Sequence, residues 1–350
     1  MFAGRVSNQT THFAISAVVL LLLLPDSVCA QVATDVVIVR RPENHREFRY
    51  SGRILDYSGG SLRLRLKTSG RIRRFETADI QGIQTPRSEP HVQAEQFAAL
   101  RQYQPALESY AGAIDAETRD WVRRDIYAAL TRLHLREGQR MKAAEAFISL
   151  TNSDPKTHFR GLAPLWWSTD EQITPVMEAQ AKLWTKSPNY FAQLIGASVL
   201  FNIPAERSAA MKLMDAIAGN GRGFIHLARA QLWRARLVDG KPVNNAEIRL
   251  WRGRLGSMLP EERGGPWFVI GKANAQRLEN EEAAIAFLWV PLVHKQDHLL
   301  AAEASYYAAL SLQKNGSLAE ATNLYRETAQ RYPGTEFAKK SQQVLKLPGK

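Results

Sequence analysis

The chain has 350 residues, of which 45% are apolar and 23% charged, and its net charge at pH 7 is +12. This is the composition of a folded globular protein, and the length allows one large core or two domains. A single cysteine excludes a disulfide-stapled fold. The basic balance favours an acidic partner such as anionic lipid, acidic polysaccharide or acidic protein, without choosing among them.

Residues 1–30 have the layout of a secretory signal peptide. Arg5 and His12 precede an apolar run at 13–24, and Val28-Cys29-Ala30 places small residues before Gln31. We expect cleavage after Ala30, a periplasmic or secreted location and no transmembrane span afterwards. The run of 12 residues is shorter than the roughly 20 that cross a bilayer, although retention as an anchor is the alternative. Cleavage would remove the only cysteine and any thiolate chemistry with it.

Residues 31–86 alternate apolar and polar side chains, which indicates four or five short strands. Gly59-Gly60 and Ser69-Gly70 are expected to form hairpin turns. A three-residue loop, 68–70, would pair Leu66 with Ile72, Lys67 with Arg71 and Arg65 with Arg73, so that the aliphatic side chains share one face. We predict a small β-barrel, followed by a proline-containing linker at 85–90. The stretch 52–66 resembles the bent strand pair of Sm-like or SH3-like barrels.

The other face of this hairpin is predicted to be basic, and its candidate anion-binding residues are Arg63, Arg65, Lys67, Arg71 and Arg73. Like charges opposite one another repel unless an anion or nearby acids offset them. The face is therefore either a docking strip for a polyanion or a solvated surface balanced by neighbouring carboxylates. Nucleic acid is not an expected partner, because the strip lacks a repeated aromatic for base stacking and the chain is predicted to be exported.

Residues 302–335 predict two amphipathic helices separated at Asn315-Gly316 and ended by Pro333. The order of residues resembles the tetratricopeptide repeat (TPR) family. The matching positions are the small pair Ala308-Ala309, the turn residue Gly316, the second-helix pair Ala321 and Tyr325, and the closing Pro333. Such hairpins bury their faces by stacking on their neighbours.

Further copies of this pattern begin at residues 87, 124, 189, 227 and 264. Apart from one gap they keep a spacing of 37 or 38 residues, against about 34 in the family. In three copies the small residue and the aromatic recur in step, as Ala143 with Phe147, Ala283 with Phe287, and Ala321 with Tyr325. We therefore predict a mainly α fold: a TPR-like α-solenoid of helical hairpins over 87–350, preceded by the small β-barrel at 31–86.

Residues 156–188 break the repeat phase and are rich in tryptophan. Trp166-Trp167 precede a predicted helix at 173–186 that carries Trp184. Clustered tryptophans either line a recognition pocket or close a core where the repeat is interrupted. The second interpretation is favoured.

The sequence contains no recognisable set of catalytic residues, so we expect a protein that is not an enzyme and has no cofactor or metal. His294 and His298 have helical metal-ligand spacing, but no third ligand follows at a matching interval. The glycine-rich stretch 219–223 follows no strand and lacks the lysine of a phosphate-binding loop. An enzyme would need the tryptophans and this stretch to converge on a titratable group.

The TPR resemblance implies a partner-binding groove lined by first-helix positions, here Arg132, Arg136, Phe268, Lys272 and Tyr306. The closing repeat resembles those of bacterial envelope TPR proteins. We therefore expect an exported, non-enzymatic adaptor that binds a protein or peptide partner in the bacterial envelope. The alternative is a binder of anionic envelope polymer or membrane surface, acting through the basic barrel.

Overall fold

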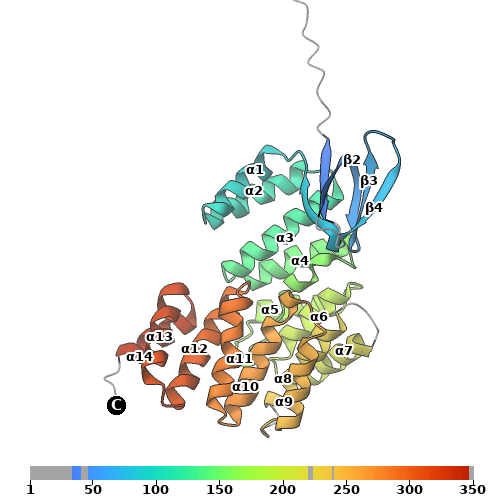
Figure 1. The fold of residues 1–350 in the computed structure, drawn as a ribbon. Helices are drawn as coiled ribbons and strands as arrows, with labels where there is room; N and C mark the ends of the chain where they lie inside the picture. Colours follow the sequence, from blue (N-terminus) through green and yellow to red (C-terminus); the bar gives the residue numbers. More distant parts are fainter. Residues whose placement is uncertain (1–33, 41–45, 220–223, 239, 347–350) are drawn as a thin grey trace, which may run out of the picture. The chain divides into compact units, whose positions relative to one another are not determined.

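The computed structural model describes residues 34–40, 46–219, 224–238 and 240–346 (Figure 1). The predicted signal peptide and most of the glycine-rich stretch 219–223 lie outside these residues. The described part contains 14 α-helices and one five-stranded antiparallel sheet, which confirms the mainly α class with a small β element at its start. Within it, no helix has the length and apolar character needed to cross a membrane.

The sheet has the strand order β4-β3-β2-β1-β5, so β4 and β5 are its edges. Gly59 and Gly60 connect β2 to β3 with φ values of 57° and 86°. Glycine adopts this left-handed conformation without strain, and it confirms the predicted hairpin turn. The strands are β1 (Asp35–Arg40), β2 (Glu47–Ser58), β3 (Ser61–Leu66), β4 (Ile72–Glu76) and β5 (Ile80–Gln84), with a 3-10 turn, η1 (Thr77–Asp79), between the last two.

The predicted register of the β3–β4 hairpin is wrong by one residue. Arg65 pairs with Ile72 and Leu64 with Arg73, instead of Leu66 with Ile72 and Arg65 with Arg73. The loop holds four residues rather than three, because the Leu66 N–H bonds the Arg71 carbonyl at 2.9 Å. Arg73 therefore lies on the inner face. Its guanidinium stacks over Tyr50, 4.4 Å from the ring centre, which makes the apolar surroundings tolerable.

The helical part is a series of hairpins, in which α10 packs on α11, α11 on α12 and α12 on α13. The predicted break at Gly316 separates α12 from α13, and φ there is 85°. The helices are α1 (Glu89–Ala99), α2 (Tyr103–Ala116), α3 (Asp120–Arg136), α4 (Arg140–Ser153), α5 (Pro175–Thr185), α6 (Tyr190–Leu200), α7 (Arg207–Gly219), α8 (Ile225–Val238), α9 (Asn245–Leu255), α10 (Gly264–Gln276), α11 (Asn280–Val293), α12 (His298–Lys314), α13 (Leu318–Arg331) and α14 (Glu336–Lys346), with 3-10 turns η2 (His158–Leu162) and η3 (Pro260–Glu262).

The small residues of the repeat pattern are buried. Ala143, Ala283 and Ala321 lie in helix–helix contacts with exposures of 0%, 0% and 2%. Gly271 of α10 is packed so closely on Phe287 of α11 that an added Cβ would come within 2.6 Å of the ring. Small residues let the paired helices approach, as the spacing predicted.

The sheet and the first helices share one hydrophobic core. Val37, Leu62 and Leu64 belong to the same buried cluster as Leu107 of α2 and Trp121 of α3. Polar contacts add to this cluster. Asp56 of β2 forms an ion pair with Arg124 of α3, and the Gly59 N–H donates to Asp154 Oδ2 at 3.0 Å. The described residues from Thr34 onward accordingly belong to one compact unit.

Candidate binding surfaces

The outer face of strands β2, β3 and β4 carries a cluster of arginines. We name this cluster the arginine face; it consists of Arg49, Arg53, Arg63, Arg65 and Arg74, all exposed. Arg53 pairs with Arg65 across β2 and β3, and Arg63 pairs with Arg74 across β3 and β4. Only Arg74 of this cluster has an ion pair among the described residues, to Glu76 at 3.3 Å. Two directly opposed like-charge pairs cost stability that a bound anion would recover.

The arginine face differs in membership from the basic strip that the sequence predicts. Arg63 and Arg65 belong to both, Lys67 and Arg71 are exposed beside the β3–β4 loop, and Arg73 lies on the inner face. Arg49, Arg53 and Arg74 were missed. Arg49 and Arg53 could have been found from their period-2 spacing in β2. Arg74 could have been placed on this face only with the correct register of the β3–β4 hairpin.

A second notable feature is a non-helical stretch, residues 163–174, which we name the inner segment. It contacts helices α6, α8, α10 and α12. The Trp166 N–H donates to Ser198 Oγ of α6 at 3.1 Å, and the Trp166 carbonyl accepts from Gln231 Nε2 of α8 at 3.1 Å. Ser168 Oγ donates to Glu303 Oε1 of α12 at 2.8 Å. Lys272 Nζ of α10 donates to Asp170 Oδ2 at 2.7 Å.

The carboxylates of the inner segment are held by cations from the helices. Arg140 of α4 contacts Glu171 at 2.5 Å and Asp297 at 3.1 Å. Burial opposes its charge, but the two carboxylates outweigh burial and raise the pKa of Arg140 above its ordinary value. Burial likewise disfavours ionised Asp170, yet Lys272 holds its pKa below the usual range. The segment is therefore fixed by charge-assisted bonds as well as by apolar burial.

Arg234 of α8 lies under the inner segment and is fully buried. Its guanidinium donates to the Ser168 carbonyl at 3.0 Å and to the Ser198 carbonyl at 3.1 Å, and it stacks 4.5 Å from the ring centre of Phe201. Burial lowers the pKa of Arg234 to about 9, so the group stays protonated at neutral pH. Its role is to satisfy backbone carbonyls that would otherwise be buried without donors.

The structure does not gather the five predicted groove residues on one open surface. Lys272 contacts the inner segment. Phe268 is fully buried against Phe287, and Tyr306 packs on Tyr325 and Phe337. Arg132 and Arg136 are exposed on α3, stacked over Phe159 and Tyr103.

The tryptophans of the inner segment and of α5 are part of the core. Trp166, Trp167 and Trp184 lie in the largest buried cluster, which agrees with the favoured interpretation of the 156–188 region. His294 is buried and His298 begins α12. Within the described ranges, no group of three or more His, Cys, Asp or Glu side chains is arranged to hold a metal ion.

Comparison with known proteins leaves the family open. No family model, curated protein or solved structure matches the chain.

Proposed function

We propose that this chain is an exported, non-enzymatic binding protein that recognises an anionic polymer of the cell envelope through the arginine face. The observation that carries the proposal is the two directly opposed arginine pairs, Arg53 with Arg65 and Arg63 with Arg74. Arg63 also lies opposite Asp56, but of these four arginines only Arg74 has an ion pair within the described residues. A row of guanidinium groups offers bidentate hydrogen bonds to successive carboxylates, sulfates or phosphates. The net charge of +12 adds long-range attraction.

The inner face of the hairpins is less suited to an external peptide, because the inner segment already occupies it. Leu165, Trp166 and Trp167 are buried there with exposures of 1%, 0% and 6%. Displacing them would re-expose side chains whose burial is worth roughly 1.5–3 kcal/mol each. A partner peptide would have to repay that cost before gaining any affinity.

The test is binding of the full chain to a soluble polyanion, dextran sulfate, as a function of salt. The triple variant Arg53→Gln, Arg63→Gln, Arg65→Gln is expected to weaken binding about 10- to 100-fold at low salt and to flatten the salt dependence. The matched control, Arg229→Gln, Arg249→Gln, Arg254→Gln, removes the same charge from exposed positions on α8 and α9 and should change affinity less than twofold. Equal losses of affinity in the two triple variants would refute a dedicated face.

A second experiment measures binding to anionic vesicles. Tighter binding to vesicles than to polymer would redirect the proposal to a lipid surface.

We also propose that the helical part is a TPR-like solenoid and that the sheet is a partly closed barrel. The solenoid is supported by the buried small residues at matching repeat positions and by the sequential hairpin packing. The barrel is supported by strand irregularities at Ile38/Val39 and at Ile54/Asp56, which bend strands, and by the short η1 link between the two edge strands. Export rests on the predicted signal peptide, and loss of envelope localisation on removal of residues 1–30 is its test.

The second candidate function is that of an adaptor for a protein partner, and one observation favours it. The outer side of α11 exposes Ile285, Trp289, Leu292 and Val293, each by 42% or more. These positions share one helical face, which suits the apolar side of a partner helix. Cross-linking in the native envelope should then recover a partner with the wild type and lose it with Leu292→Lys. Recovery of the same partner with both proteins would exclude this face.

A further inference from the structure

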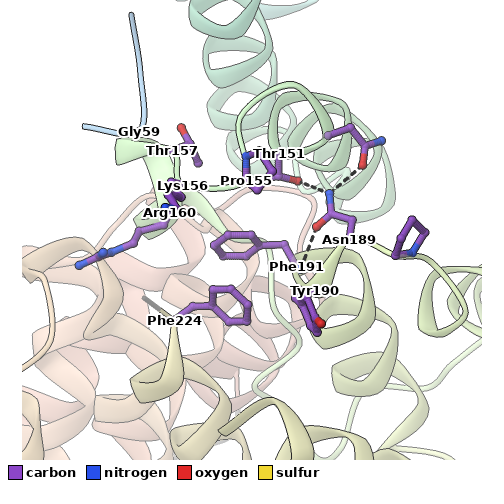
Figure 2. A pocket seen from close by; sticks show the side chains of 12 residues that line it. Gly59, Thr151, Pro155, Lys156, Thr157, Arg160, Asn189, Tyr190, Phe191 and Phe224 are labelled. Atoms are coloured by element: carbon purple, nitrogen blue, oxygen red, sulfur yellow. Dashed lines mark hydrogen bonds between the residues drawn. The ribbon is translucent and has the colours of Figure 1, made fainter. Parts of the chain in front are cut away.

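A concavity of about 760 Å³ lies between the end of α4, the η2 turn and the start of α6 (Figure 2). Its size is within the range of small-molecule sites, about 300–1,000 Å³. It is lined by segments that are distant in sequence, from Gly59 of the β2–β3 turn to Phe224 before α8. We name it the aromatic pocket.

The walls of the aromatic pocket are largely apolar. The rings of Phe191 and Phe224 lie side by side with centres 4.3 Å apart (Figure 2). Pro155 and Pro188 also line the space. The two rings are buried, with exposures of 3% and 6%, and form the floor of the space, whereas Pro155 and Pro188 are exposed and Tyr190 is half-buried. These three side chains offer the apolar surface from which water would be released when a planar or short-chain apolar body binds.

Several polar groups of the lining are already committed to one another. Asn189 Nδ2 donates to Thr151 Oγ1 and to Asn152 Oδ1, both at 2.8 Å, and Asn189 Oδ1 accepts from the backbone N–H groups of Phe191 and Ala192 at the start of α6 (Figure 2). Arg160 forms an ion pair with Glu262 at 3.0 Å. These bonds hold the walls in place without a ligand, so the pocket is pre-formed.

Lys156 is the exception among the cations of the lining. It is exposed, and no described residue forms an ion pair or hydrogen bond with its ammonium group. It lines both the aromatic pocket and a neighbouring cleft that contains Arg53 and Arg63. An unpaired ammonium beside an apolar pocket supplies one charge-assisted bond to an anion.

We propose that the aromatic pocket binds a small anionic amphiphile. Its apolar body would lie against Pro155, Pro188 and Tyr190, above the buried rings of Phe191 and Phe224, and its single carboxylate or sulfonate would contact Lys156. Lys156 also lines the cleft that contains Arg53 and Arg63, but no residue of the arginine face lines the aromatic pocket. Binding of the small molecule is therefore tested separately from polymer binding.

The test uses 2-naphthoate and its uncharged analogue 2-naphthamide, titrated into the full chain by calorimetry. We expect saturable 1:1 binding, with naphthoate about fivefold tighter than the amide, the effect of one partly exposed ion pair. Lys156→Gln should reduce naphthoate affinity to that of the amide and leave the amide unchanged. Lys142→Gln, an exposed lysine on α4 away from the lining, is the matched control and should have no effect.

A second variant tests the location of the site without altering charge. Asn152 is exposed at the end of α4 and lines the space, so Asn152→Trp should fill it and abolish binding of both compounds, with thermal unfolding confirming that the variant folds. The proposal is overturned by failure of both compounds to bind at millimolar concentration. It is also overturned if naphthoate and the amide bind with equal affinity and Lys156→Gln changes neither. Binding that persists in folded Asn152→Trp would overturn it as well.

Discussion

Glu303 is a buried carboxyl group whose hydrogen bond within the described chain comes from Ser168 of the inner segment. Burial raises its pKa to about 7, the attraction of Lys272 opposes this rise, and repulsion from Asp170 and Glu171 adds to it. Folding therefore favours the protonated form of Glu303 relative to the unfolded chain. Since the ordinary pKa is 4.5, the folded protein binds more protons than the unfolded chain between about pH 4.5 and 7.

The variant Glu303→Gln should reveal this penalty. Stability contributed by Glu303 is fully present below pH 4.5 and is lost as pH rises towards 7. Gln keeps the acceptor for Ser168 and cannot ionise, so we expect the stability of Glu303→Gln relative to the wild type to rise by about 2–3 kcal/mol from pH 5 to pH 8. Urea unfolding at the two pH values measures the difference. Glu320→Gln, an exposed site on α13, is the control, and a similar pH-dependent gain there would remove the explanation.

At the scale of elements, the inner segment depends on close approach to the helices that it contacts. Trp167 lies directly over Gly265 of α10, and a Cβ at that glycine would fall 1.9 Å from the indole. Trp167 cannot move aside to relieve this overlap, because its side chain is itself buried. Gly253 of α9 has nothing within 4 Å of its Cβ position.

Alanine at these two glycines should have opposite effects on stability. Gly265→Ala must displace Trp167 and is expected to lower the free energy of unfolding by about 1–3 kcal/mol or more. Gly253→Ala should be neutral or should raise it by up to about 1 kcal/mol, because alanine is the better helix former. Thermal unfolding of both variants provides the comparison. A Gly265→Ala protein as stable as the wild type would mean that Trp167 does not pack there.

The elements themselves could be predicted from local patterns, whereas their long-range contacts could not. The predicted helix at 173–186 is α5, and the region 156–188, where the repeat phase breaks, contains the non-helical inner segment. The contact between Ser168 and Glu303, however, joins residues 135 positions apart. The shift of Arg73 to the inner face depended on one residue of loop length between Leu66 and Arg71, which period-2 alternation does not determine.

At the scale of the whole described unit, the sheet and helices share a core that the sequence division at residue 86 did not foresee. Leu64 of β3 and Trp121 of α3 lie in one cluster. Arg124 is 7% exposed in its side chain and has Asp56 as its ionic partner. A buried charge that loses its partner costs more than the pair contributes. The ion pair is therefore a sensitive point at which to test whether the sheet unfolds with the helices.

Asp56→Ala should lower the free energy of unfolding by about 3 kcal/mol, because it leaves the Arg124 guanidinium buried without a counter-charge. Asp79→Ala, at the sheet edge in η1 and without an ion pair in the described chain, is the control and should cost less than about 1 kcal/mol. Hydrogen exchange of peptides covering β3 and α3 distinguishes the two architectures. A shared core requires both peptides to lose protection by the same amount in Asp56→Ala, since they open in one cooperative event. Loss confined to β3, with α3 unchanged, would instead establish the sheet as a separate folding unit, and the arginine face could then be studied on an isolated domain.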